Sequence, residues 1–130
     1  MLDELPLHDA TFDGILLKDK NAKLHFTTVK GARREVRLSG VDALHLSDFR
    51  EGNIVVFTGV SSKEVPQHGV DWERLYPSPH PSAAESYHND WRAHLSSKQE
   101  ALRSGNLMLL QVVPAHGADL LATCRTVTFV

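Results

Sequence analysis

The sequence has one cysteine, no long apolar run and almost no excess of charge of either sign. Because Cys124 is the only cysteine among the 130 residues, the chain forms no internal disulfide and no cysteine-rich zinc cluster. No apolar run approaches the ~20 residues that a transmembrane helix needs. The net charge of −2 is spread over mixed signs, so electrostatics give no reason to expect nucleic acid or a membrane as a partner.

The first residues lack the features of an export signal. Residues 1–6 are acidic and end on a proline, without the basic and apolar regions of a signal peptide, so we expect a cytoplasmic protein. A hydrophobic fraction of 42% and a charged fraction of 23% are ordinary for a soluble domain and exclude a disordered or collagen-like chain. The length predicts a single domain over residues 1–130.

Recognisable catalytic motifs are also missing. No serine stands in a Gly-x-Ser-x-Gly elbow, and no glycine loop has phosphate-binding spacing. The 8 histidines invite a metal hypothesis, but His88 and His94 would point about 120° apart on a helix. His8 and Asp9 are neighbours at the start of a strand, where adjacent side chains point to opposite faces, so we do not expect them to pair. We predict no catalytic, cofactor-binding or metal-binding residue.

The first half of the chain consists of short apolar runs separated by turn residues, which is typical of a β meander. Four segments have the composition or alternation of strands: residues 10–17, 23–29, 35–38 and 54–57. The alternation places Leu24 and Phe26 on the core side of one strand and Val36 and Leu38 on the core side of the next. The β-branched segment 54–57 should be central. Residues 41–46 either continue the third strand after a kink or form a separate one.

The second half begins with a long loop. Residues 59–82 contain four prolines and no period, with one helical turn expected over residues 71–76. Ser82 and Glu85 have the spacing of a capping box, which predicts that a helix begins there. Residues 103–106 have the character of a helix stop.

The predicted helix spans about residues 83–103, and its apolar face also carries His94 and Lys98. Either the helix covers the sheet only partly, with these side chains at its edge, or it breaks at residues 96–97; we favour one helix. Residues 107–113 and 120–130 should then pair as a C-terminal hairpin. Strands that precede a helix predict an α+β fold with an antiparallel sheet of about six strands, the helix packing on one face before the hairpin.

Aromatic residues concentrate on the long loop and the start of the helix. Tyr87 and Trp91 have the helical spacing of core residues. Trp72 and Tyr76 lie on the irregular loop, where we expect exposed anchors for a protein partner, because such residues dominate binding hot spots. The predicted partner-binding residues are Trp72, Glu73, Tyr76 and His80.

Four segments of the first half carry a family resemblance: residues 5–10 (LPLHDA), 24–26 (LHF), 38–41 (LSGV) and 48–54 (DFREGNI). Together they make the chain resemble a group of small uncharacterised bacterial proteins, some of which look like immunity proteins of polymorphic toxin systems. The likeness covers about the first 57 residues. It implies a small α+β domain whose partner is a cognate toxin, and it supplies no site residues. We therefore expect, as the leading hypothesis, a non-enzymatic protein-binding domain of the immunity type that blocks a toxin by covering its active site.

Two other functions stay open at this point. The chain is alternatively a small enzyme or a small-molecule binder whose site lies between the 59–82 loop and the sheet and uses His8, His68 or His80. It is otherwise a structural subunit that assembles through an edge strand such as residues 126–130. The sequence leaves the oligomeric state undecided.

Overall fold

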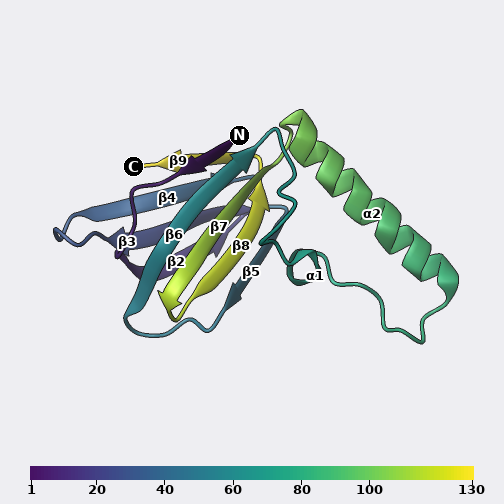
Figure 1. Ribbon diagram of the computed structural model, residues 1–130, viewed down its shortest axis with the longest axis horizontal. Coiled ribbons are helices and arrows are strands. Elements are labelled where there is room, and N and C mark those ends of the chain that lie inside the picture. The colour runs from purple at the N-terminus through teal and green to yellow at the C-terminus, as the bar shows by residue number, and fades with distance from the viewer.

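The computed structural model describes residues 1–130 and contains nine strands and two helices (Figure 1). In chain order the elements are β1 (Leu2–Glu4), β2 (Thr11–Lys18), β3 (Asn21–Thr27), β4 (Arg33–Ser39), β5 (Ala43–Ser47), β6 (Asn53–Ser62), α1 (Trp72–Leu75), α2 (Glu85–Ser104), β7 (Met108–His116), β8 (Asp119–Cys124) and β9 (Thr126–Phe129). Every strand pairing is antiparallel. The predicted α+β class, the antiparallel sheet and the main helix are confirmed.

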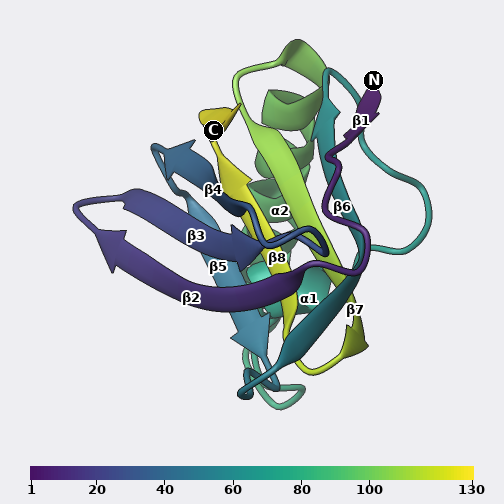
Figure 2. The same cartoon turned by 90° about the vertical axis from the view of Figure 1, so that its left-hand side faces the viewer.

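The sheet rolls up and closes on itself. Its strands follow the order β5-β8-β7-β6-β2-β3-β4-β9, and β1 lies along β6. Short bends at residues 40–42 and at Arg125 join β4 to β5 and β8 to β9, and β4 pairs with β9 while β5 pairs with β8. The β4–β5 segment and the β8–β9 segment therefore pair with each other on both sides of their bends. This pairing connects the two ends of the strand order. Figure 2 shows the β2–β3 hairpin crossing in front of β5 and β8.

The main core fills the interior of the rolled sheet. Leu24, Phe26, Val36 and Leu38 are all buried there, as their alternation predicts. Phe26 stacks on Phe12 with ring centroids 4.8 Å apart. Strand β6 pairs with β7, β2 and β1, so the predicted central position of residues 54–57 is also confirmed.

A second, smaller core lies on the outer face of β7 and β8. Leu109 and Leu121 of these strands pack against Leu75 of α1 and Leu102 of α2, and all four are buried. Figure 1 shows α1 beside the sheet and α2 farther out, so the N-terminal part of α2 is separated from the strands by α1 and its loop. The helix runs unbroken from residue 85 to residue 104. Neither helix combines the length and apolar character that crossing a bilayer requires.

The strand count exceeds the expected six for three local reasons. Strand β1 is a three-residue exposed strand without an apolar pattern. The bend at Gly40, where φ is +61°, makes residues 43–47 a separate strand, and the bend at Arg125 divides the predicted last strand in two. The pairing of β7 with β8 confirms the C-terminal hairpin.

The two ends of α2 differ in how well the sequence predicted them. Gly105 adopts a left-handed conformation and its N–H donates to the Leu102 carbonyl at 3.2 Å, which confirms the helix stop. The predicted capping box is wrong: α2 begins at Glu85 after Ala84, and no side chain caps it. The Ser82 hydroxyl instead lies 2.7 Å from Nδ1 of His80, within the turn that precedes the helix.

Candidate functional site

The loop that carries the predicted partner-binding residues is held by polar contacts at α1. Asp71 caps α1, because its Oδ1 accepts from the Glu73 N–H at 3.1 Å. Arg74 lies 3.4 Å from Asp71 and donates to Asp119 of β8 at 3.2 Å. Glu73 accepts from the Ser78 N–H and hydroxyl at 3.0 and 2.8 Å, which folds the chain after α1 back toward the helix. The loop is therefore anchored to the sheet.

Tyr76 is buried and does not face solvent. Only 7% of the residue is exposed, so the expectation that Tyr76 is an exposed anchor is wrong. Its hydroxyl donates to Oδ2 of Asp42 at 2.7 Å and lies 2.7 Å from the Thr123 hydroxyl, which then acts as donor to Tyr76. Burial, together with the neighbouring Asp42 carboxylate, raises the pKa of Tyr76. Tyr76 thus links α1 to β8 and to the β4–β5 bend.

The same carboxylate fastens α2. The Lys98 ammonium donates to Oδ1 of Asp42 at 2.8 Å, and the Trp91 indole N–H donates to the Tyr76 carbonyl at 2.9 Å. The His94 ring lies edge-on to Tyr76, with centroids 5.7 Å apart. Burial alone would raise the pKa of Asp42, but hydrogen bonds from Lys98 and Tyr76 and the charge of Lys98 outweigh it and hold the pKa below its usual value.

This network was only partly visible in the sequence. Lys98 stood out as a charge on the apolar face of the predicted helix, which is a signal of a paired or edge position. Asp42 and Thr123 carry no such signal, because their roles depend on contacts with residues 34 and 47 positions away in the chain. Hydrogen bonds over such separations are set by the fold.

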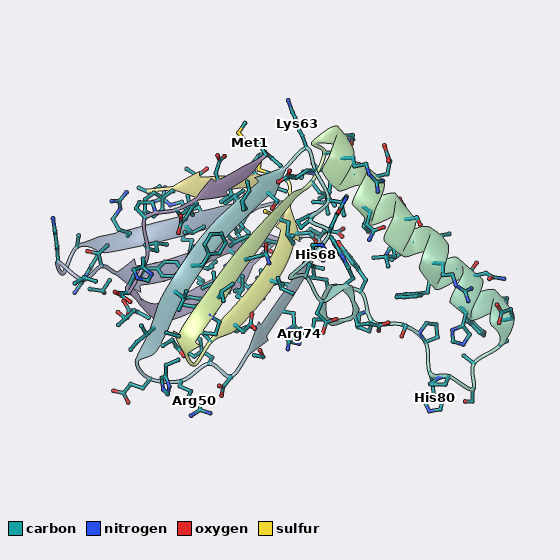
Figure 3. The ribbon with its side chains drawn as sticks, in the orientation of Figure 1. Met1, Arg50, Lys63, His68, Arg74 and His80 are labelled. Carbon is teal, nitrogen blue, oxygen red and sulfur yellow. The ribbon has the colours of Figure 1, made fainter.

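The remaining candidates occupy two places. Trp72 is half-buried at the second core, and Glu73 is exposed but engaged by Ser78. His80 is exposed beyond α1, and Figure 3 shows it at the far end of the loop from Arg74 and the sheet. Tyr87 is 63% exposed on the first turns of α2, so its predicted core position is wrong. We call residues 77–91, which contain His80 and Tyr87, the arm.

The histidines of the enzymatic alternative do not converge. Figure 3 shows His68 close to the sheet and His80 at the far tip of the arm. Nδ1 of His8 lies 2.8 Å from the Val56 carbonyl of β6, and its Nε2 lies 3.4 Å from Asp9. No three side chains of histidine, cysteine, aspartate or glutamate are placed to hold a metal ion together.

The contact between His8 and Asp9 corrects the expectation that they do not pair. Asp9 has a φ of +62° and lies in a turn, so the two side chains are not on opposite faces of a strand. The hydrogen bond to the Val56 carbonyl, followed by the Asp9 charge, raises the pKa of His8. Both ring nitrogens face acceptors, which favours the imidazolium form.

A groove of about 590 Å³ does lie between the loop and the outer face of β7 and β8. Its polar lining consists of Asp71, Arg74, Gln111 and Asp119, without a histidine. The Gln111 amide donates to the Gly69 carbonyl at 3.2 Å and ties the loop to β7. A groove is therefore present where the enzymatic alternative places its site, but none of the expected histidines lines it.

Fold and surface together define a small α+β domain whose rolled antiparallel sheet carries one projecting helix. No family model matches the chain, and no curated protein matches its sequence. The fold is similar to that in the crystal structure of an uncharacterized protein from Neisseria gonorrhoeae, with a TM-score of 0.54 and 10% sequence identity. The match covers 99% of this chain and 96% of the Neisseria protein, so the two share their fold along nearly their whole lengths.

Proposed function

We propose that this chain is a non-enzymatic protein-binding domain of the immunity type, which neutralises a cognate bacterial toxin by covering the toxin's active site. The observation that carries the proposal is the exposed Tyr87 on the arm, next to a loop that hydrogen bonds hold in place. Tyrosine and tryptophan are enriched among residues that dominate protein interfaces. The resemblance of the first 57 residues to immunity-like proteins supplies the class of partner.

The anchoring of the arm favours tight binding. Trp91 bonds to the Tyr76 carbonyl, and Lys98 bonds to Asp42, so the helix that presents Tyr87 is attached at two points. A surface that is ordered before binding loses less conformational entropy when a partner docks. In this proposal Tyr87 and His80 contact the toxin, and Trp72 and Glu73 form the inner margin of the same surface.

The test is to co-express the chain with the product of each neighbouring gene and to measure binding by calorimetry. Tyr87→Ala should weaken binding by about 30-fold, which corresponds to the ~2 kcal/mol of a hot-spot residue. Val29→Ala is the matched control, because Val29 is 73% exposed at the β3–β4 turn, away from the arm. Trp72→Ala should also lower affinity, with circular dichroism to check its fold, since Trp72 packs on the second core.

The proposal fails if no neighbouring gene product inhibits growth and binds this chain. It also fails if such a toxin binds Tyr87→Ala and wild type equally, because the interface would then lie elsewhere.

The groove beside α1 supports a second candidate function, the binding of a small molecule. Its volume of about 590 Å³ falls within the usual range of ligand sites, roughly 300–1,000 Å³. Asp71, Arg74 and Asp119 would recognise a polar ligand there. Ligand screening by NMR, with Asp119→Asn as the site variant, tests this function.

The outer edge of β9 supports a structural role. Strand β9 stands at the end of the strand order and pairs only with β4, so its other edge is free to pair with another chain. Light scattering at two protein concentrations distinguishes a monomer from a concentration-dependent assembly.

A further inference from the structure

The C-terminal half of α2 meets the two bends of the sheet around a cleft of about 560 Å³. The cleft lies at the other end of α2 from Tyr87, so it is separate from the arm. Its polar lining comes from the β2–β3 turn, the β4–β5 bend, α2, the α2–β7 connection and the β8–β9 bend: Lys20, Asp42, Ser97, Lys98, Asn106 and Arg125. Segments far apart in sequence thus place polar groups around one space.

The charge of this cleft is positive and largely uncompensated. Lys98 is paired with Asp42, whose two carboxylate oxygens are occupied by Lys98 and Tyr76. Lys20 and Arg125 have no carboxylate within 4.0 Å, so two cations remain unpaired. Asp19, next to Lys20 in the turn, lines a different depression on the hairpin and does not line the cleft.

Neutral hydrogen-bonding groups add to the cations. The side chains of Ser97 and Asn106 line the cleft and form no hydrogen bond within the protein. Two carbonyls in the last turn of α2 are already engaged, because the Gly105 N–H donates to Leu102 at 3.2 Å and the Leu107 N–H donates to Ala101 at 3.1 Å. The lining therefore offers free donors and little free negative charge.

The fold places both unpaired cations. Lys20 has a φ of +61° in a two-residue hairpin turn, a conformation that glycine or asparagine adopts at lower cost, and its carbonyl accepts from the Val41 N–H at 2.8 Å. A Cβ on Gly40 would lie 2.8 Å from Cγ and Cδ of Arg125, so the absence of a side chain there lets the arginine stem lie across the bend. The two cations are therefore positioned by turn geometry.

We propose that this cleft binds a small phosphate monoester. Such a group carries a charge of about −1.5 to −2 at neutral pH, which matches the two unpaired cations. The Arg125 guanidinium presents paired donors that match two phosphate oxygens, and Lys20 supplies a second, point-like charge. Ser97 and Asn106 donate to the remaining oxygens. The volume of the cleft leaves space for the organic part of the ligand.

The test uses amide NMR of the intact chain titrated with ribose 5-phosphate, at constant ionic strength. Shifts should concentrate at residues 20, 97–98, 106 and 125, and Arg125→Gln or Lys20→Gln should weaken binding at least about tenfold. Arg33→Gln is the matched control, since Arg33 is an exposed arginine without an ion pair, lies at the opposite end of β4 from Gly40 and does not line the cleft, so this change should leave the affinity unchanged.

Titrations with malonate and with inorganic phosphate show which part of ribose 5-phosphate causes the amide shifts. Saturable binding of ribose 5-phosphate with weaker binding of malonate supports the proposal, and binding of inorganic phosphate at the same residues supports recognition of the phosphate group itself. Equal binding of malonate, or shifts that survive Arg125→Gln with the fold intact by circular dichroism, would overturn it.

Discussion

Replacing Tyr76 by phenylalanine removes one hydroxyl and leaves the buried ring in place. The hydroxyl now donates to the Asp42 carboxylate and accepts from Thr123, both at 2.7 Å. A hydrogen bond to a charged group contributes about 1.5–3 kcal/mol, and the Thr123 hydroxyl, which is fully buried, would be left without a partner. Because Lys98 still neutralises Asp42, we expect Tyr76→Phe to lower the free energy of unfolding by about 3 kcal/mol.

Urea unfolding followed by circular dichroism measures this loss. With a slope of about 2 kcal/mol per molar urea, the midpoint should fall by about 1.5 M. Adding Thr123→Val to Tyr76→Phe removes the unpaired hydroxyl, so the double variant should be about as stable as Tyr76→Phe or more stable. Tyr87→Phe is the control, because Tyr87 is exposed and its hydroxyl has no hydrogen bond; it should change stability by less than about 0.5 kcal/mol.

A loss below about 0.5 kcal/mol for Tyr76→Phe would refute the reasoning, since Tyr76 would then not link α1 to the sheet. A second variant tests the packing of the Tyr76 ring separately from its hydroxyl. Tyr76→Leu also removes much of the ring and should be less stable than Tyr76→Phe, because Tyr76 packs in the second core with Leu102 and Leu109.

Two further predictions concern polar groups at other junctions of the fold. The pKa of Asp42 lies below its usual 3.8 in the folded protein, so the Asp42 carboxylate stabilises the fold fully above about pH 5. This stabilisation is lost as the pH falls through 3.8 and then through the pKa of folded Asp42. We therefore expect the difference in the free energy of unfolding between wild type and Asp42→Asn, measured with urea, to shrink from about pH 7 to about pH 3. A gap that does not change with pH would contradict this. The buried Asn53 amide accepts from the N–H groups of Arg50 and Ala118 and donates to the Phe12 carbonyl. We therefore expect Asn53→Ala to lower the free energy of unfolding, measured with heat or urea, by about 2–4 kcal/mol. The control is Asn21→Ala, which should change it by almost nothing because Asn21 is exposed.

Much of the secondary structure could be predicted because its causes are local. Alternation of Leu24 and Phe26 with polar residues places one face of β3 in the core whatever its neighbours are. The positive φ of Gly105 ends α2 at the position that the residue type indicates. Ser82 and Glu85 show the limit of such signals, because the His80 ring takes the serine hydroxyl that the capping box requires.

The candidate site was harder to predict because burial of a loop residue depends on what crosses over it. Tyr76 and Tyr87 have similar chemistry, yet Tyr76 is buried by α2 and Tyr87 projects from it. His8 and Asp9 meet because a turn replaces the strand that their position suggested. In each case a contact or a backbone angle outside the local pattern decided the outcome.

The amino-acid sequence by itself determined the α+β class, the succession of a meander, a main helix and a C-terminal hairpin, and the core-facing residues of β3 and β4, because periodicity and turn residues act over a few positions. Only the tertiary structure decided that the sheet closes through the bends at Gly40 and Arg125, and that Asp42 meets Lys98 from 56 residues away. Pairing over such distances reflects the free energy of the whole fold, in which the burial of one segment depends on the placement of all the others.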